Sequence, residues 1–427
     1  MGLRAGCAAF PVTPPVPGPM GGYAARRGPS RGVADPLWAR ALVLEDSGVK
    51  AALVIADLLA IPRPLAEAVR LQAAPALGVR PEHIVVAATH THSGPALPPV
   101  PPEADEALLA WLGRALASAL VLADQDLEPV TAGWETAAAP GLAANRRDPD
   151  LPADPNVTGL ALWRADGSLK GLLLNHACHP TVLGPSNDLL SADFPGAGVD
   201  MLQRALGGTV WVAYAQGAAG DVSCRFTRRA QTLAEVRRLG TILAGAGLVI
   251  AGRAAPGRAT PLRVLSRTVP LALREFPPVA ELEAQAEAAA QELERLEAAG
   301  ASPPEKRLAE SLLEGVQSSL VFARLAGRLE REAEVTALRL GDAALVALPG
   351  EPFSALARAI RERSPFGTTF VLGYAGGYIG YVPDREAYRR GGYETLAAWV
   401  EPGAADRLVG AAVSLLEALC GEGGGGG

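Results

Sequence analysis

Residues 83–95, HIVVAATHTHSGP, combine an apolar run with two histidines that follow it directly. The run Ile84–Ala88 predicts a buried β-strand, and the closing Ser-Gly-Pro predicts a turn. Because side chains alternate along a strand, His90 and His92 would project to the same side just beyond its carboxyl end, where open α/β sheets build their sites. The chain has only five histidines among 427 residues. The pair therefore indicates a site, although two histidines packed in a loop would explain it equally well.

Similar apolar runs, each bounded by turn residues, recur along the chain. They are AALVIADLL at 51–59, GLLLNHA at 171–177, VWVAYAQG at 210–217, DAALVALPG at 342–350 and TFVLGYAGG at 369–377. Helix-like segments at 64–77 and 195–206 precede the runs HIVVAATH and VWVAYAQG, which is the order of an α/β domain. Asp166-Gly167 separates two strand-like runs and signals an antiparallel hairpin. The sequence therefore predicts an α/β fold with a mixed β-sheet core flanked by helices.

The segment 279–325 has a helical pattern instead. Apolar residues recur at steps of three and four, first at Leu282, Ala286, Ala289, Leu293 and Leu296, and then at Leu308, Leu312, Val316 and Leu320. We predict a helical hairpin inserted into a single α/β domain that spans residues 1–420. A partner-binding coiled coil is the alternative, but the repeat is short for one. The glycine-rich end, 421–427, predicts a flexible tail.

The composition argues against several classes of partner and location. Hydrophobic residues make up 49% of the chain and charged residues 20%, as in soluble globular proteins. The formal net charge of −6 disfavours nucleic acid and anionic membranes, which both require a basic surface. Neither a transmembrane segment nor a signal peptide is recognised, which predicts a cytoplasmic protein. The four cysteines are scattered without a CxxC pair, so no disulfide framework or zinc knuckle is expected. The oligomeric state stays open.

A second histidine cluster strengthens the case for a metal site. NHACHP at 175–180 carries His176 and His179, again directly after an apolar run. Neutral imidazole is the commonest biological metal ligand, and a catalytic zinc site needs about three or four protein ligands with an open position. A carboxylate is the natural third ligand, and Glu351 in LVALPGEPF follows another apolar run. Taken alone, this glutamate would as readily be an acid in the first turn of a helix.

The loop that follows the run at 210–217 adds a serine. AYAQGAAGDVSCR at 213–225 ends in Asp221, Val222 and Ser223. Ser223 is a candidate nucleophile or a hydrogen-bond partner of a metal-bound water, and Asp221 is a candidate turn cap. No GxSxG elbow surrounds the serine, which argues against a Ser-His-Asp hydrolase. GYAGGYIG at 373–380 lacks the GxGxxG pattern of a dinucleotide site.

Taken in order, these motifs resemble the neutral ceramidases, zinc-dependent amidases that hydrolyse ceramide to sphingosine and a fatty acid. The matching stretches are THTHSGP (89–95), ACHPT (177–181), SADFPG (191–196), GDVS (220–223), VALPGEPF (346–353) and YVPDREAYRRGGYE (381–394). The resemblance extends from about Ala5 to Leu396 and covers only the family's N-terminal catalytic domain. We therefore expect neither the family's C-terminal immunoglobulin-like domain nor its secretion signal.

The resemblance also implies a set of site residues. A zinc ion would be held by His90, His179, Glu351 and Tyr381. The residues that act on the substrate or on water would be His92, Arg146, Ser223 and Tyr393. Zinc in such a set polarises an amide carbonyl and lowers the pKa of bound water toward about 7. The other residues would divide oxyanion stabilisation, placement of water and protonation of the leaving amine among themselves.

Departures from the family pattern fall beside these residues. Cys224-Arg225 stands where the family has Pro-Asn, and Arg147 stands where it has the serine of an Asn-Arg-Ser segment. These changes concern substrate contacts and spare the expected metal ligands. The sequence therefore predicts a zinc-dependent amidohydrolase that cleaves an N-acyl substrate, with a ceramide-like lipid first. The alternatives are a hydrolase of a smaller or more polar amide or ester, and a catalytically inactive relative that binds a ligand.

Overall fold

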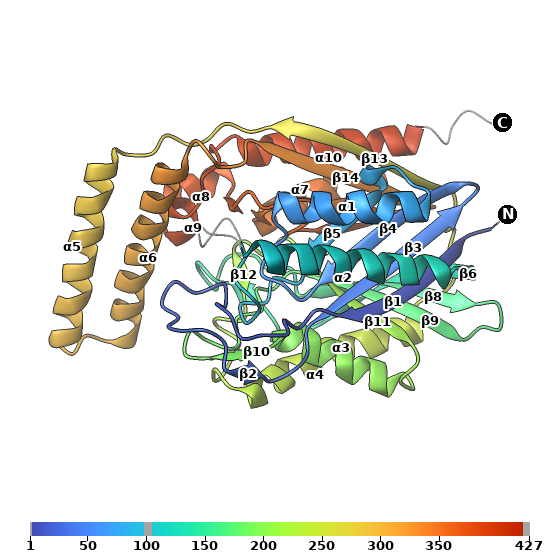
Figure 1. Cartoon of the computed structure of the whole chain (residues 1–427), viewed down its shortest axis with the longest axis horizontal. Helices are drawn as coiled ribbons and strands as arrows, with labels where there is room; N and C mark the ends of the chain where they lie inside the picture. Colours follow the sequence, from blue (N-terminus) through green and yellow to red (C-terminus); the bar gives the residue numbers. More distant parts are fainter. Residues whose placement is uncertain (1, 98–104, 422–427) are drawn as a thin grey trace.

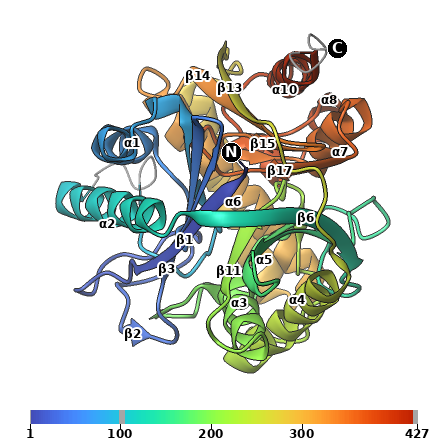
Figure 2. The ribbon, with the colours of Figure 1, turned by 90° about the vertical axis from the view of Figure 1, so that its right-hand side faces the viewer.

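Two β-sheets packed face to face form the centre of the structure, and helices cover their outer faces (Figure 1, Figure 2). The computed structural model describes residues 2–97 and 105–421. The predicted fold class, an α/β fold with a mixed sheet flanked by helices, is confirmed.

The larger sheet has eight strands. In spatial order they are β11 (Trp211–Gln216), β9 (Leu169–His176), β8 (Asn156–Arg164), β6 (Glu128–Ala138), β1 (Arg4–Pro11), β3 (Trp38–Asp46), β4 (Val49–Ala56) and β5 (Ile84–Ala88). The outer pairs β11–β9 and β4–β5 are parallel, and the other neighbours are antiparallel. Four of the predicted apolar runs form β4, β5, β9 and β11, and Asp166-Gly167 joins β8 to β9 as expected.

Alternating side chains of this sheet serve two separate cores. Val43 and Val54 face two helices, α1 (Arg63–Leu77) and α2 (Glu106–Gln125), whereas Leu42 and Leu53 face the smaller sheet. Both sides of these strands are apolar because neither side meets water. Two further helices, α3 (Asp193–Ala205) and α4 (Leu233–Arg253), cover the other half of the same outer face, over β6, β8, β9 and β11.

By length and composition, α2 is the one helix within the described residues that is apolar enough to cross a membrane. It packs against α1, β1 and β3, as a core helix of a globular domain does. The cytoplasmic location stays a prediction.

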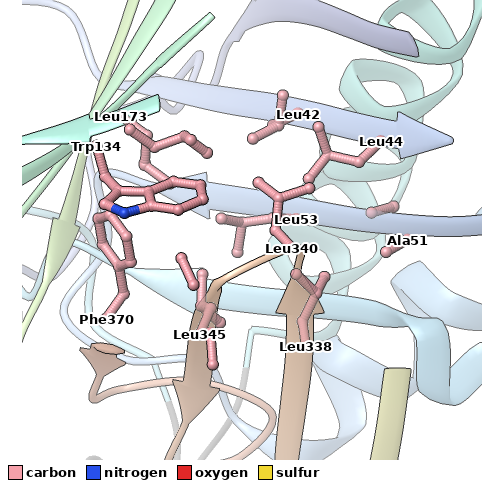
Figure 3. Close-up of a pocket in the computed structure, with 14 residues that line it drawn as sticks. Leu42, Leu44, Ala51, Leu53, Trp134, Leu173, Leu338, Leu340, Leu345 and Phe370 are labelled. Carbon is pink, nitrogen blue, oxygen red and sulfur yellow. The ribbon is translucent and has the colours of Figure 1, made fainter. Parts of the chain in front are cut away.

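The smaller sheet has four strands, in the order β13 (Leu262–Pro270), β14 (Glu332–Leu340), β15 (Ala343–Ala347) and β17 (Thr368–Leu372). Figure 3 shows the interior between the sheets, where leucines of both sheets meet Trp134 and Phe370. Burial of this apolar area stabilises the sandwich by about 25 cal/mol per Å² removed from water. The outer face of this sheet is covered by α7 (Ser354–Arg363) and α10 (Ala404–Gly421).

One chain path occurs three times in these sheets. An antiparallel strand pair is followed by a helix, by a strand parallel to the second strand, and by another helix. The three units are β3-β4-α1-β5-α2, β8-β9-α3-β11-α4 and β14-β15-α7-β17-α10. Backbone hydrogen bonds join the units where their parallel strands end, from Ala88 N to Tyr374 O (3.1 Å) and from Gly373 N to Gln216 O (3.0 Å). The carboxyl ends of all three parallel pairs therefore meet in one place.

Short pairings beyond these ends complete the framework. They are β2 (Gly32–Val33) with β10 (Leu189–Leu190), β7 (Ala144–Asn145) with β12 (Val222–Ser223), and β16 (Glu351–Pro352) with β18 (Tyr381–Val382). A single-turn 3-10 helix, η1 (Pro81–His83), precedes β5, and two short helices, α8 (Arg385–Arg390) and α9 (Tyr393–Leu396), follow β18. The predicted site residues lie on these short elements and on the loops between them.

The predicted helical hairpin is confirmed as α5 (Val279–Ala298) and α6 (Pro303–Leu325), which extends from one end of the two-sheet body (Figure 1). The prediction for the start of its second apolar stripe is wrong, because Leu308 is 75% exposed and Leu312 is 50% exposed. α6 packs along α5 and α9, and Val316 of the same predicted stripe is buried as expected. The predicted extent of the single domain stays a prediction. Of the expected tail, Gly421 ends α10, and residues 422–427 lie outside the described residues.

Candidate active site

Four side-chain donor atoms converge where the three units meet. His90 and His92 follow β5, His179 follows β9, and Glu351 lies in β16 just beyond β15. The Nε2 atom of His90 lies 3.0 Å from Nε2 of His179 and 3.2 Å from Nε2 of His92. Oε2 of Glu351 lies 3.3 Å from Nε2 of His90 and 3.1 Å from Nε2 of His179. All four side chains are buried, and we call them the donor cluster.

The proton positions in this cluster follow from its backbone contacts. Nδ1 of His90 lies 2.6 Å from Leu59 O, and Nδ1 of His179 lies 2.6 Å from Ala219 O. A carbonyl oxygen only accepts hydrogen bonds, so each Nδ1 carries the proton and each neutral ring leaves a bare lone pair on Nε2. Oε2 of Glu351, which faces both lone pairs, has no hydrogen-bond donor among the described residues. Three buried lone-pair atoms thus face one another without a proton between them.

A cation resolves this arrangement. Burial is the main cause that lowers the pKa of His179 to about 3, and the nearby charge of Arg146 adds to it. Burial likewise holds the pKa of His92 well below its usual value. Both rings are therefore neutral in the range where proteins work. Neutral imidazoles and a carboxylate are a metal-ligand set, and the three histidines form a buried group whose ligand atoms all lie within 4.8 Å of one another. This chain's donors fit a divalent metal ion.

Two tyrosines that were not predicted from the sequence hold the cluster in place. The Tyr378 hydroxyl donates to Oε1 of Glu351 at 2.6 Å, which leaves Oε2 free for the centre. The ring of Tyr374 stacks on His90 at 4.1 Å between centroids, and both residues have a left-handed backbone, with φ of 56° and 67°. Such strained conformations concentrate at functional sites. A usable signal was present: GYAGGYIG follows an apolar run, as the histidine segments do.

Tyr381 lies beside the donor cluster, and His92 belongs to it. Tyr381 pairs with Glu351 across β16 and β18, and its ring lies 6.5 Å from that of His179. Burial raises the pKa of Tyr381 well above its usual value, although the nearby Arg146 opposes this rise. His92 places Nε2 among the donor atoms, and its ring packs so closely on Gly22 that a Cβ there would come within 2.6 Å of Nδ1. Their assignments, Tyr381 as a metal ligand and His92 as a substrate or water contact, stay predictions.

Arg146 is fixed beside the cluster by both main chain and side chain. Its backbone N donates to Asp221 O at 2.8 Å, its Nη2 donates to Gly220 O at 2.9 Å, and its Nε lies 2.8 Å from Oε1 of Glu394. Burial works against the charged form, but Tyr381 and Glu394 raise the pKa of Arg146 well above its usual value. The pairing with Glu394 was not predicted. It keeps a permanent positive charge at this point of a buried site.

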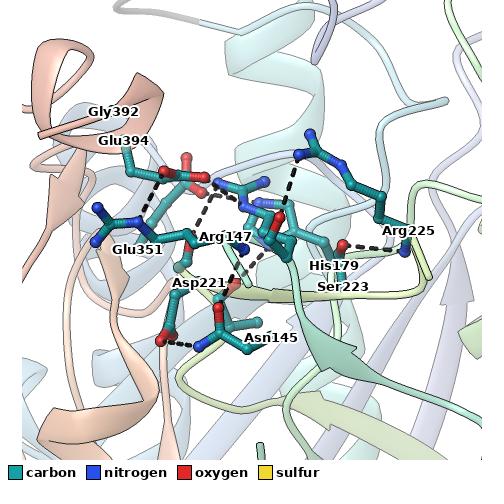
Figure 4. A network of polar contacts seen from close by, with 12 residues as sticks. Asn145, Arg147, His179, Asp221, Ser223, Arg225, Glu351, Gly392 and Glu394 are labelled. Atoms are coloured by element: carbon teal, nitrogen blue, oxygen red, sulfur yellow. Dashed lines mark hydrogen bonds and ion pairs between the residues drawn. The ribbon is translucent and has the colours of Figure 1, made fainter. Parts of the chain in front are cut away.

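The carboxylate of Asp221 joins two distant segments, which differs from the predicted cap of a local turn. This carboxylate accepts from the side-chain amide of Asn145 at 2.9 Å (Figure 4). It also accepts from the backbone N of Ser354 at 2.6 Å. Gly220, just before it, lies so close to β16 that a Cβ would come within 2.5 Å of Glu351 O. The small-residue loop therefore lets the serine segment pack directly on the glutamate segment.

Ser223 lies next to His179 through a parallel β-bridge, and its Oγ accepts from the backbone N of Arg225 at 3.1 Å (Figure 4). It lines a cleft of about 320 Å³ that opens beside the donor cluster. Four other predicted site residues line the same cleft, namely His92, Arg146, Tyr381 and Tyr393. One wall of this cleft comes from α6. The eight predicted site residues are thus found in the donor cluster or along this cleft.

His176 does not join the cluster, although it belongs to the same sequence motif as His179. Its side chain turns away at the end of β9, and its Nδ1 lies 2.8 Å from Asn156 O. Two acidic residues near the motifs also have structural roles. Asp57 accepts from the backbone N of Trp38 at 2.9 Å, and Asp193 accepts from two backbone N–H groups.

Comparisons with known proteins agree with this architecture. No family model matches the sequence, and no curated protein sequence matches it. Among solved structures, neutral ceramidase from Pseudomonas aeruginosa aligns with a TM-score of 0.78 and 20% identity, over 99% of this chain and 75% of that chain. A ceramidase complexed with C2 aligns with a TM-score of 0.79 and 19% identity, over 99% of this chain and 76% of that chain. The chain therefore has the fold of neutral ceramidase, as the order of its sequence motifs predicted.

Proposed function

We propose that this chain is a zinc-dependent amidohydrolase of the neutral ceramidase family, and that it cleaves the amide bond of N-acyl substrates, with a ceramide-like lipid as the first candidate. The observation that carries the proposal is the donor cluster, in which lone pairs of His90, His179 and Glu351 face one another at 3.0–3.3 Å without a proton. The fold shared with ceramidases and the cleft beside the cluster support the same activity.

In this proposal His90, His179 and Glu351 hold the ion, and His92 and Tyr381 are the two candidates for a further position. When bound, zinc would polarise an amide carbonyl and lower the pKa of a water molecule, so that the water loses a proton and becomes a nucleophile near neutral pH. The backbone carbonyls of Leu59 and Ala219 keep the lone pairs of His90 and His179 aimed at the centre.

The residues along the cleft then divide the remaining work. The guanidinium of Arg146 stays charged and stabilises negative charge that develops on the amide oxygen. The Ser223 hydroxyl lies within the same cleft and donates a hydrogen bond to that oxygen or to the attacking water. Burial raises the pKa of Tyr393 to about 12, so its phenol stays protonated and can donate to the leaving nitrogen.

Metal analysis combined with a substrate panel tests the proposal. We expect about one zinc per purified chain. We also expect hydrolysis of N-acylsphingosine or of a shorter N-acyl amide, abolished by a chelator and restored by zinc. A chain without stoichiometric metal and without turnover would instead be an inactive ligand-binding relative. Turnover that survives complete removal of metal would refute metal dependence.

A further inference from the structure

The cleft beside the donor cluster is rich in arginine. Its lining includes four arginines and two glutamates, namely Arg146, Arg225, Arg228, Arg307, Glu310 and Glu314. The arginines come from separate segments: Arg146 follows β7, the next two follow β12, and Arg307 lies on α6. A substrate that enters this cleft has to tolerate or require the positive charge of these arginines.

Two of the arginines are neutralised within the protein. Arg146 pairs with Glu394 at 2.8 Å. Arg307 lies 2.9 Å from Glu310 and 3.3 Å from Glu314, so both glutamates that line the cleft are paired with it on α6. None of these ion pairs includes an arginine that follows Ser223.

Arg225 and Arg228 have no such partner. Each is half-buried, and each uses Nη1 to donate to a backbone carbonyl, Arg225 to Arg146 O at 3.2 Å and Arg228 to Thr181 O. Within residues 2–97 and 105–421, no carboxylate oxygen lies within 4.0 Å of either guanidinium. Burial, reinforced by the charges of Arg146 and Arg307, lowers the pKa of Arg225. Arginine nevertheless stays charged in proteins, so this positive charge is not lost by deprotonation.

An anion is the ligand that would compensate the positive charge of Arg225 and Arg228. Partly desolvated cations without a counter-charge are costly, and a guanidinium pairs best with a carboxylate or phosphate through two parallel hydrogen bonds. The backbone N of Arg225 donates to Ser223 Oγ, so the pair of arginines begins directly beside the predicted catalytic serine (Figure 4). A neutral diol head group, such as that of ceramide, would leave both guanidiniums without a direct ion-pair partner.

We infer that Arg225 and Arg228 form an anion subsite, and that the substrate is an N-acyl compound with a carboxylate or phosphate near its scissile amide. This inference rests on the proposed amidohydrolase function and specifies its substrate class. It makes the two arginines specificity-determining residues.

Three matched substrates test it with the zinc-loaded full chain. N-Octanoylserine carries a carboxylate, N-octanoylserinol replaces that carboxylate with a neutral hydroxymethyl group, and N-octanoylserinol phosphate carries a phosphate. We expect kcat/KM for at least one anionic substrate to exceed that for N-octanoylserinol by about 10- to 100-fold, as for a hydrogen bond to a charged group. The carboxylate and phosphate arms identify which anion the subsite takes.

The double variant Arg225→Gln/Arg228→Gln keeps hydrogen-bonding side chains of similar length but removes both charges. We expect the anionic preference to fall by about 10-fold or more, mainly through a higher KM for the anionic substrate. Arg253→Gln, at the exposed end of α4, is the matched control and should keep the wild-type preference.

Each contrary result has a distinct meaning. Wild-type protein that hydrolyses N-octanoylserinol at least as well as both anionic substrates overturns the subsite and leaves the amidohydrolase proposal standing. An anionic preference that survives in the double variant overturns the assignment to these two arginines. Hydrolysis of none of the three substrates, nor of N-acylsphingosine, overturns the proposed function itself.

Discussion

The donor cluster and the α5–α6 hairpin border the same cleft but are built in opposite ways. The cluster is buried, and its side chains come from three separate ββαβα units. Backbone carbonyls orient its histidines, and a tyrosine hydroxyl holds its glutamate. The hairpin is one contiguous segment, and α5 buries only Leu282 and Ala289. Many of its polar side chains pair with each other along exposed helix surfaces.

This difference teaches where chemistry and selectivity can each reside. Atoms in the cluster are held by hydrogen bonds to backbone carbonyls and from Tyr378, and a catalytic centre needs such fixed geometry. The exposed ion pairs of the hairpin are worth little energy and are easily exchanged. The donor cluster thus suits a reaction common to many substrates, and the lining of the cleft, which includes α6 and the arginines that follow β12, suits the choice among them. Substitutions in the two regions should therefore differ greatly in effect.

The largest effect is expected for His90→Ala. The change removes the Nε2 atom that lies within 3.3 Å of His92, His179 and Glu351. Metal catalysis contributes several kcal/mol, so we expect loss of bound metal and at least about a 1,000-fold fall in kcat/KM. Metal analysis measures the metal content, and steady-state kinetics measures kcat/KM. Circular dichroism shows whether the variant is folded.

The matched control for this variant is His83→Ala, in η1 and outside the cleft. Its Nδ1 lies 3.0 Å from Lys50 O, so the change removes an imidazole with no route to the centre. It should retain metal and rate. Full turnover by folded His90→Ala protein would show that the chemistry does not occur at the donor cluster.

The second-largest effect is expected for Ser223→Ala, because this residue lines the cleft and is bridged to His179 of the donor cluster. Its Oγ accepts a hydrogen bond from the backbone N of Arg225. Loss of one hydrogen-bond donor to a developing oxyanion costs about 100- to 1,000-fold in rate. We therefore expect kcat to fall by this amount while the metal content stays at the wild-type level. Loss of metal as well would mean that the serine shapes the centre through its bridge with His179.

These contrasts show why the sequence predicts some parts of the molecule better than others. Apolar runs such as VWVAYAQG and DAALVALPG predict buried strands because neither face of those strands meets water. The sheet order, and the meeting of the three units, depends on contacts between distant segments that leave no local pattern. His179 and Ser223, for example, are adjacent only because β12 lies beside the loop after β9.

The same reason explains the gaps in the predicted site. Tyr378 and Glu394 act through long-range contacts with Glu351 and Arg146, and the local sequence of a residue does not reveal such a distant partner. His176, which follows the same apolar run as His179, instead places its Nδ1 on the carbonyl of Asn156 in the neighbouring strand β8. Leu308 is exposed although it belongs to the predicted apolar stripe of the hairpin, because periodicity does not show which part of a stripe packs against another element.

A smaller effect is expected for Tyr378→Phe, which leaves all donor atoms in place. The variant removes only the hydroxyl that donates to Oε1 of Glu351 at 2.6 Å. Groups that orient metal ligands typically contribute about 10- to 100-fold to metal affinity, so competition with a chelator should show a loss of that size. Tyr388→Phe, whose hydroxyl donates to Val400 O, is the control and should bind metal normally. Equal metal affinity in both variants would mean that Glu351 needs no such support.

The smallest effect is expected on the hairpin wall, for Glu310→Gln. Glu310 lies 2.9 Å from Arg307 on the partly exposed surface of α6, and Arg307 keeps its second contact with Glu314. An exposed ion pair contributes at most about 1 kcal/mol, so the midpoint of thermal unfolding should barely move, and kcat/KM should change by less than about fivefold. Thermal unfolding measures the midpoint, and steady-state kinetics with N-octanoylserinol and with an anionic substrate measures kcat/KM. The anionic substrate should gain slightly, because a negative charge has left the cleft. If this variant instead lost activity as severely as Ser223→Ala, α6 would take part in the reaction itself. The division between a catalytic donor cluster and a selective cleft lining would then fail.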